Sequence, residues 1–362
     1  ATYTPPAPGA ITAGGTLSND GGRIYAGGPI TLNTPQINNA GGSLSVASMA
    51  VTGPNFSNAG GTLNVSNSFS ANVGQLDNSG GTLHAGSLQI STTGDLINVD
   101  GKLTSDSDAN LSVGGKLDNM RGTVSATGAL TAGVAGALNN TSGALVANNS
   151  VALTAASLDN TQGSIQSANA NTQLAIANQL TNNGGTIGAS ADVSVQAGSL
   201  SNSGSIRGTN DTTLTVSGAL TNDGSITAGR NTTVTTGSVA SGTAGVLGAG
   251  VGNDGKLGAA GDLHVTASGA LVANGTNLAA GNATLQGASV DLSSSQTSAV
   301  NIAITATQGN VTTSGATVTT PGTLAITADS QPTQTLVNNA GQLNAGQLDL
   351  HASNIANTNN GE

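Results

Sequence analysis

The sequence predicts an all-β fold, a parallel β-helix of about 18 coils of roughly 20 residues each that forms an elongated rod. Three observations predict it. A short phrase, QLDNSGGTLHAGSLQIS at 75–91, returns in similar form about every 20 residues. Apolar residues alternate inside each unit, as at Leu88 and Ile90, which is typical of a strand with one buried face. Gly, Asn and Ser separate these strands, as turns require.

Each unit begins with an apolar residue two positions before an Asn, and the units follow at steps of 19 to 22 residues. Stacked coils place equivalent residues above one another, so we expect a ladder in which each Asn amide bonds to the next coil. We also expect Asn at this corner because it tolerates a left-handed backbone. The expected ladder is Asn19, Asn39, Asn58, Asn78, Asn98, Asn119, Asn140, Asn160, Asn182, Asn202 and Asn222.

A Gly follows each ladder Asn by two or three residues. We expect it where φ is positive or where the corner leaves no room for a Cβ. The aliphatic residues are expected to form continuous inward stripes, in a bore too narrow for aromatic rings, which make up 1% of the chain. The expected structural glycines are Gly81, Gly101, Gly122, Gly143, Gly163, Gly184, Gly204 and Gly224.

The repeat predicts three segments along one continuous rod. Residues 1–238 hold the regular repeat, after a lead-in of ten residues with three prolines. The pattern breaks in the Gly- and Ala-rich run SGTAGVLGAGVGNDGKLGAAG, so 239–335 are expected to form variant or irregular coils, with this run as a loose coil or a surface loop. The phrase LVNNAGQLNAGQLDL then marks the return of the regular repeat over 336–362.

Composition argues against several function classes. The chain has no Cys, seven Lys plus Arg, four aromatic residues and a net charge of −10, which disfavour thiolate metal sites and nucleic-acid binding. No apolar stretch is long enough to span a bilayer. The three histidines, His84, His264 and His351, lack metal-ligand spacing, and the first two are expected to point outward. We therefore expect no catalytic residue, no metal, no cofactor and no enzyme activity.

Acidic residues are scattered, and three of them, Asp77, Asp118 and Asp159, directly precede a ladder Asn. They are expected to form a solvated anionic edge on one corner, with Ca²⁺ binding as the alternative. The run Asp106-Ser107-Asp108 is expected in an outward turn. The only local group of cations, Lys102, Lys116 and Arg121, is too sparse for the catalytic groove of a polysaccharide-cleaving β-helix.

The recurrent L-[DST]-N-x-x-G-[GTS]-[LIV] units, with tails such as GGTLHAGSLQIS, resemble the repeats of filamentous haemagglutinin and of contact-dependent growth-inhibition exoproteins. The resemblance covers nearly the whole chain. It implies a right-handed β-helix, export by two-partner secretion through an outer-membrane transporter, and display on the surface of a Gram-negative bacterium. Neither the family's N-terminal secretion domain nor a C-terminal toxin is visible in the sequence.

Two functions follow as hypotheses. The first is a structural rod or stalk, which extends a distal adhesive or toxin region from the cell. The alternative is that the segment itself is adhesive and binds a host glycan, a host receptor or a neighbouring bacterium. Solenoids offer extended surfaces of this kind, and departures from the repeat, such as 239–335, often mark them.

Overall fold

A computed structural model describes residues 9–12, 14–252, 254–258, 260–328 and 330–362. The described residues form strands and turns and contain no helix, so none could cross a membrane as a helix. Of the expected lead-in, residues 1–8, with all three prolines, lie outside the described residues. The chain divides into two compact units, 1–177 and 178–362, and each is a stack of parallel β-coils.

One coil of the first unit shows how the repeat folds. It has three faces: a two-residue strand on face A, a four-residue strand on face B and a five-residue strand on face C. Alternating burial within the strands turns every second side chain inward. The three strands are β10 (Leu96–Ile97), β11 (Lys102–Ser105) and β12 (Ala109–Val113).

Three corners join the faces of this coil. Corner 1, residues 98–101, follows face A and contains the ladder Asn. Corner 2, residues 106–108, leads from face B to face C, and corner 3, residues 114–116, leads back to face A. Short polar and Gly-rich corners fit within a 20-residue coil because each of them turns the chain in three or four residues.

The strands of the first unit are β1 (Gly9–Thr12), β2 (Thr16–Ser18), β3 (Arg23–Ala26), β4 (Ile30–Asn33), β5 (Gln36–Asn38), β6 (Ser43–Val46), β7 (Met49–Ser57), β8 (Thr62–Asp77), β9 (Thr82–Thr92), β10, β11, β12, β13 (Leu117–Asp118), β14 (Thr123–Ala126), β15 (Leu130–Val134), β16 (Ala137–Asn139), β17 (Ala144–Ala147), β18 (Val151–Ala155), β19 (Ser157–Asp159), β20 (Ser164–Ser167) and the first part of β21 (Thr172–Asn182).

The strands of the second unit are the rest of β21, β22 (Thr186–Ala189), β23 (Val193–Asn202), β24 (Ser205–Gly208), β25 (Thr212–Asn222), β26 (Ser225–Ala228), β27 (Thr232–Ser241), β28 (Val246–Ala249), β29 (Leu263–Ala267), β30 (Leu271–Ala273), β31 (Thr276–Ala279), β32 (Asn282–Gly287), β33 (Val290–Asp291), β34 (Gln296–Ser298), β35 (Asn301–Ala306), β36 (Val311–Thr312), β37 (Thr317–Ala328), β38 (Thr335–Asn339), β39 (Gln342–Ala352) and β40 (Asn354–Thr358).

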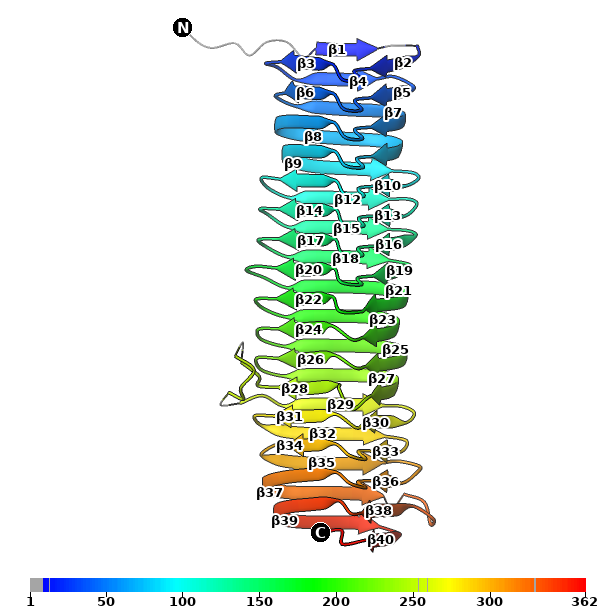
Figure 1. The fold of residues 1–362 in the computed structure, drawn as a ribbon, viewed down its shortest axis with the longest axis vertical. Coiled ribbons are helices and arrows are strands. Elements are labelled where there is room, and N and C mark those ends of the chain that lie inside the picture. The colour runs from blue at the N-terminus through cyan, green and yellow to red at the C-terminus, as the bar shows by residue number, and fades with distance from the viewer. Residues whose placement is uncertain (1–8, 13, 253, 259, 329) are drawn as a thin grey trace. The chain divides into compact units, whose positions relative to one another are not determined.

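Each strand pairs in parallel with the equivalent strand of the next coil. In the first unit Leu96 pairs with Leu117 on face A, and Leu103 pairs with Val124 on face B. In the second unit Ile206 pairs with Ile226 on face B. Figure 1 shows the strands of each unit stacked in chain order. The fold class predicted from the repeat is confirmed, with about 17 turns instead of the expected 18.

The core of each unit is a set of aliphatic columns that run along all three faces. Leu76, Leu96 and Leu117, for example, form successive layers on face A and are fully buried. The expectation that the bore excludes aromatic rings is wrong. Phe56 and Phe69 are both buried, and their ring centroids lie 6.1 Å apart at a tilt of 34°. The interior therefore accepts a pair of rings where two such residues meet.

The Gly- and Ala-rich run forms one strand of a coil and then a loop outside the stack, which we name the excursion. Residues 246–249 form β28 on face B, and the chain then leaves the stack before it re-enters at β29 (Figure 1). At the base of the excursion Gly250 and Gly261 both have positive φ and lie in close contact. The division of the chain at 238 and 335 stays a prediction.

Candidate functional site

Corner 1 of the regular coils holds a buried Asn whose amide makes three bonds. Asn78 is fully buried. Its Nδ2 donates to the carbonyl oxygen of Gly81 at 3.2 Å, to Asn98 Oδ1 at 2.8 Å, and to the carbonyl oxygen of Lys102 at 3.1 Å. Two of these three acceptors belong to the next coil, so the side chain satisfies its own corner and links it to its neighbour.

The same bond recurs along each unit at 2.6 to 2.8 Å, which makes a continuous column of side-chain amides that we name the ladder column. Because the amides are buried, each of them depends on its neighbours for its hydrogen bonds. The first unit contains the links from Asn19 through Asn39, Asn58, Asn78, Asn98, Asn119 and Asn140 to Asn160, and the second contains those from Asn182 through Asn202 to Asn222.

The left-handed backbone of corner 1 falls two residues after the ladder Asn, so the conformational reason given for Asn is wrong. In the coils with ladder Asn from Asn19 to Asn182, the residue in that position has φ between 55° and 63°, and it is Asp100 or Arg121 in some coils and Gly80 in another. Asn is placed at the start of the corner by its side-chain bonds, and the turn itself closes at the later residue. The positive-φ residues at this corner position are Gly21, Gly41, Gly60, Gly80, Asp100, Arg121, Ser142, Gln162 and Gly184.

Most of the expected structural glycines lie where a Cβ would overlap backbone. A Cβ on Gly101 would meet the carbonyl oxygen of Asn78 in the preceding coil and the amide oxygen of Asn98. Gly184 differs, because it is the left-handed residue of its corner. The glycines with no room for a Cβ are Gly81, Gly101, Gly122, Gly143 and Gly163, which face a ladder Asn, and Gly204 and Gly224, which face the backbone of Gly185 and Gly204.

The ladder column stops in the second unit and later resumes. Asn222 Nδ2 donates to Ser241 Oγ at 3.2 Å, and the next two positions are apolar. Asn338 then donates to Asn357 Oδ1 at 3.0 Å. The column from Asn222 onward reads Ser241, Ala273, Leu292, Thr313, Asn338 and Asn357.

The aspartates that precede a ladder Asn bond to their own corner. Asp77 Oδ1 accepts from the backbone N–H and hydroxyl of Ser79, at 2.9 and 2.6 Å. Asp159 accepts the same two bonds from Thr161, whereas Asp118 accepts from the backbone of Met120 at 3.3 Å and from Asn139 at 3.0 Å. Each carboxylate thus caps a turn locally. The described residues contain no cluster of three or more metal-ligating side chains.

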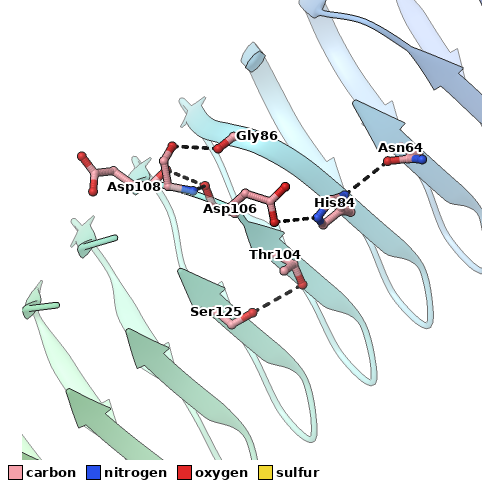
Figure 2. Close-up of polar contacts among 9 residues, drawn as sticks. Asn64, His84, Gly86, Thr104, Asp106, Asp108 and Ser125 are labelled. Carbon is pink, nitrogen blue, oxygen red and sulfur yellow. Dashed lines mark hydrogen bonds and ion pairs between the residues drawn. The ribbon is translucent and has the colours of Figure 1, made fainter. Parts of the chain in front are cut away.

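Corner 2 of the first unit carries the Asp106-Ser107-Asp108 run on the outer surface. Figure 2 shows His84 between Asn64 and Asp106, with Nε2 at 2.9 Å from Asp106 Oδ1 and Nδ1 at 3.2 Å from Asn64 Oδ1. The two side chains of the His84–Asp106 pair are 40% and 60% exposed, which leaves the pair in contact with water. His264 is exposed on β29, and His351 lies 3.0 Å from Asp349.

The cations of the first unit are also at the surface. Arg121 makes a bidentate pair with Asp100, at 2.7 and 2.6 Å, and Lys116 Nζ lies 4.0 Å from Asp118. The hydrogen bond from Arg121 lowers the pKa of the Asp100 carboxyl, and the same bond raises the pKa of Arg121. Lys102 is exposed. No convergent acid–base arrangement arises from these pairs.

The second unit contains a polar column at corner 2 that the sequence reasoning missed, which we name the outer column. Asp211 Oδ1 accepts from the backbone N–H of Asn231 at 3.1 Å, and Asp262 Oδ1 accepts from that of Asn282 at 2.7 Å. An Asp or Asn directly before each face C strand or at its first residue, at steps of 19, 20, 31, 20 and 19, is the signal that reveals it. The column is Asp192, Asp211, Asn231, Asp262, Asn282 and Asn301.

A shallow hollow of about 260 Å³ lies on face B of the first unit, over β11, β14, β17 and β20. Hydroxyl and amide side chains line it, among them Thr104, Ser125, Thr127, Asn148 and Gln166. Ser125 Oγ donates to Thr104 Oγ1 at 3.4 Å (Figure 2). The hollow therefore offers hydrogen-bonding groups repeated from coil to coil.

Comparisons with known proteins agree with this architecture. The pattern of the haemagglutinin repeat matches residues 8–53, 46–98, 96–119, 121–184, 168–206 and 188–247, more than half of the chain. The chain is 47% identical over 121 residues to Toxin CdiA of Yersinia pestis, which covers 33% of this chain and 4% of the toxin. It is 47% identical over 105 residues to tRNA nuclease CdiA-2 of Burkholderia pseudomallei strain 1026b, which covers 29% and 3%. The matches thus cover a few per cent of these relatives, and no solved structure matches.

Proposed function

Since the chain belongs to the haemagglutinin-repeat family of filamentous haemagglutinin and contact-dependent growth-inhibition exoproteins, we propose that it is a stalk segment of a large secreted surface protein. It extends a distal adhesive or toxin region away from a Gram-negative cell. The observation that carries this proposal is the ladder column, which joins successive regular coils of each unit with the same buried bond. Because each coil is stabilised by its neighbours, the number of repeats sets the length that such a segment can reach.

The outer-membrane transporter of two-partner secretion is the partner that family membership suggests during export. Parallel coils suit that route because each coil that emerges supplies a complete edge for the next one to pair with. The segment is proposed to have no enzyme activity of its own. The names of the two relatives describe a toxin and a nuclease, and the similarity to this chain covers 4% and 3% of those proteins.

Small-angle X-ray scattering of the full chain tests the stalk proposal. About 17 turns at a strand spacing of about 4.8 Å give a maximum dimension of roughly 80 Å. A compact globule of the same length would have a maximum dimension of only about 55 Å. A second protein that lacks one coil, residues 79–98, is expected to be shorter by about 5 Å. A globule-sized chain would overturn the proposal.

The hollow on face B favours a second function, adhesion to a glycan or receptor of a host cell or neighbouring bacterium. Its hydroxyl and amide groups repeat at the coil spacing, so an extended polar ligand would meet the same groups in successive coils. Binding of the labelled chain to epithelial cells and to related bacteria, measured side by side, tests this function. The double variant Asn148→Ala, Gln166→Ala should weaken saturable binding, and the matched change Thr213→Ala on an exposed face C site of the second unit should not.

A further inference from the structure

The second unit has a polar patch inside its core, on face B of the coils that contain β31 and β34. The inward column of face B is aliphatic at Ile226 and Leu247 and then continues as Asn277 and Thr297. Both polar side chains are 1% exposed. A buried amide in an aliphatic column costs stability unless each of its polar atoms has a partner.

The ladder column changes in the opposite sense in the same two coils. Ala273 and Leu292 occupy its positions there, and both are fully buried. Polar and apolar side chains have therefore exchanged places between corner 1 and face B. Asn277 Nδ2 donates to the carbonyl oxygen of Ala273 at 3.0 Å, so the displaced amide still bonds to the corner where the ladder would have been.

Two oxygen atoms of the patch receive no hydrogen bond from the protein. The second Nδ2 hydrogen of Asn277 reaches Thr297 Oγ1 at 3.1 Å, and this hydroxyl lies 3.2 Å from Ser295 Oγ. The bond to Ala273 fixes the amide orientation, because a flipped amide would place two carbonyl oxygens against each other. Asn277 Oδ1 and Asn274 Oδ1 are buried and accept no hydrogen bond from the protein.

We propose that the corner between β30 and β31 binds one internal water molecule. The water donates its two hydrogens to Asn277 Oδ1 and Asn274 Oδ1, the two oxygens that lack a donor. The Ser295 and Thr297 hydroxyls share one bond, so one hydroxyl hydrogen remains for the water to accept. Three bonds are the usual number for an internal water.

The chemistry of the patch favours water over a metal ion. Its side chains are two amides and two hydroxyls, all neutral, whereas divalent cations take several oxygen ligands that include carboxylates. Water also matches the requirement in number, since two acceptors need two donated hydrogens. The regular coils need no such molecule, because a ladder Asn such as Asn98 accepts from the previous coil and donates to the next.

High-resolution crystal structures of the full chain and of Asn277→Leu test the proposal. The native protein should show one ordered water about 2.8 Å from both orphan oxygens. The leucine variant should lack it, because one of its two acceptors is gone. A native patch without water, or a water that stays unchanged in the variant, overturns the proposal. If the variant does not crystallise, the native structure alone decides.

Hydrogen exchange of the same proteins in solution gives a second, independent measurement. A water-filled corner lets the backbone of 271–279 exchange at least about tenfold faster than the matching segment 96–105 of a regular coil. Asn277→Leu should slow exchange at 271–279 and leave 96–105 unchanged. Equal rates in the two segments of the native protein contradict a hydrated patch.

Discussion

The regular coils around Asn98 and the coils around Asn277 place the same side chain in two different positions. In the first, Asn lies at corner 1 with aliphatic residues on face B; in the second, corner 1 is apolar and the amide lies on face B. Both arrangements keep parallel pairing and register from coil to coil. The comparison teaches that pairing and shape define the coil, while the amide can be moved if its bonds are largely preserved.

The largest expected effect comes from Asn98→Leu. The change removes the shortest of the three bonds of Asn78 Nδ2 and leaves Asn119 Oδ1 without its donor, and both atoms belong to fully buried side chains. The expected loss is about 3 to 5 kcal/mol of stability, since the orphaned Asn119 Oδ1 alone costs about 1 to 3 kcal/mol and the carbonyl oxygens of Gly101 and Thr123 also lose the Asn98 Nδ2 donor. Chemical denaturation followed by circular dichroism measures it.

Asn277→Leu is the matched control for that experiment, because it restores an aliphatic column and removes an orphan oxygen. We expect a change within about 1 kcal/mol. Equal losses at the two positions would contradict the view that the two regions satisfy their amides differently.

The next largest effect is expected at the corner glycines. Their substitution tests whether the corners of both regions lack room for a Cβ. A Cβ on Gly101 would overlap the Asn78 carbonyl, and one on Gly275 would overlap the Gly245 carbonyl. Both alanine variants should therefore lose about 2 to 3 kcal/mol. Gly27→Ala, where a Cβ has open space, should be nearly neutral. Loss at Gly101 alone would show that the corner of the variant coils is looser.

A smaller effect is expected in the outer column, which continues through both kinds of coil in the second unit. Asp211→Ala and Asp262→Ala each remove an acceptor from a backbone N–H of the next coil. We expect a similar loss of about 1 kcal/mol for each, because these bonds are partly solvated. Asn at either position keeps the acceptor and should restore most of the loss, as measured by thermal unfolding.

The smallest effect is the pH dependence of the exposed pair between Asp100 and Arg121. The folded pKa of Asp100 lies below its ordinary value of 3.8, so its contribution is present above that value and is lost as pH falls through the folded pKa. Asp100→Asn should make the melting temperature slightly less sensitive to pH in that range, and added salt should reduce the difference. An unchanged acid profile would show that the pair contributes nothing to stability.

The fold class and the family followed from the sequence because the repeat unites two independent signals. The period of two inside Leu88-x-Ile90 indicates strands, and the period near 20 indicates stacked coils. The positions of ladder Asn residues such as Asn78 were also readable, since side chains that repeat at each coil meet their copies.

Other features depend on three-dimensional detail that spacing does not contain. The left-handed residue at Asp100 or Arg121 has no single residue type, so no motif marks it. Phe56 and Phe69 share the interior because they point inward from face A and face C of the same coil. The exchange at Asn277 was hidden because an Asn in a variable segment resembles a turn residue until its register with Leu247 is known.

The excursion between β28 and β29 shows that the register of the stack depends on the order of the coils and not on the number of residues between them. The step from Asn231 to Asp262 is 31 residues long, yet the outer column joins them at 3.0 Å as it joins coils that are 20 apart. Gly250 and Gly261 close the base of the excursion, so its contents are independent of the pairing above and below. Residues can therefore be inserted or deleted at that point over evolutionary time while every coil keeps its pairing partners.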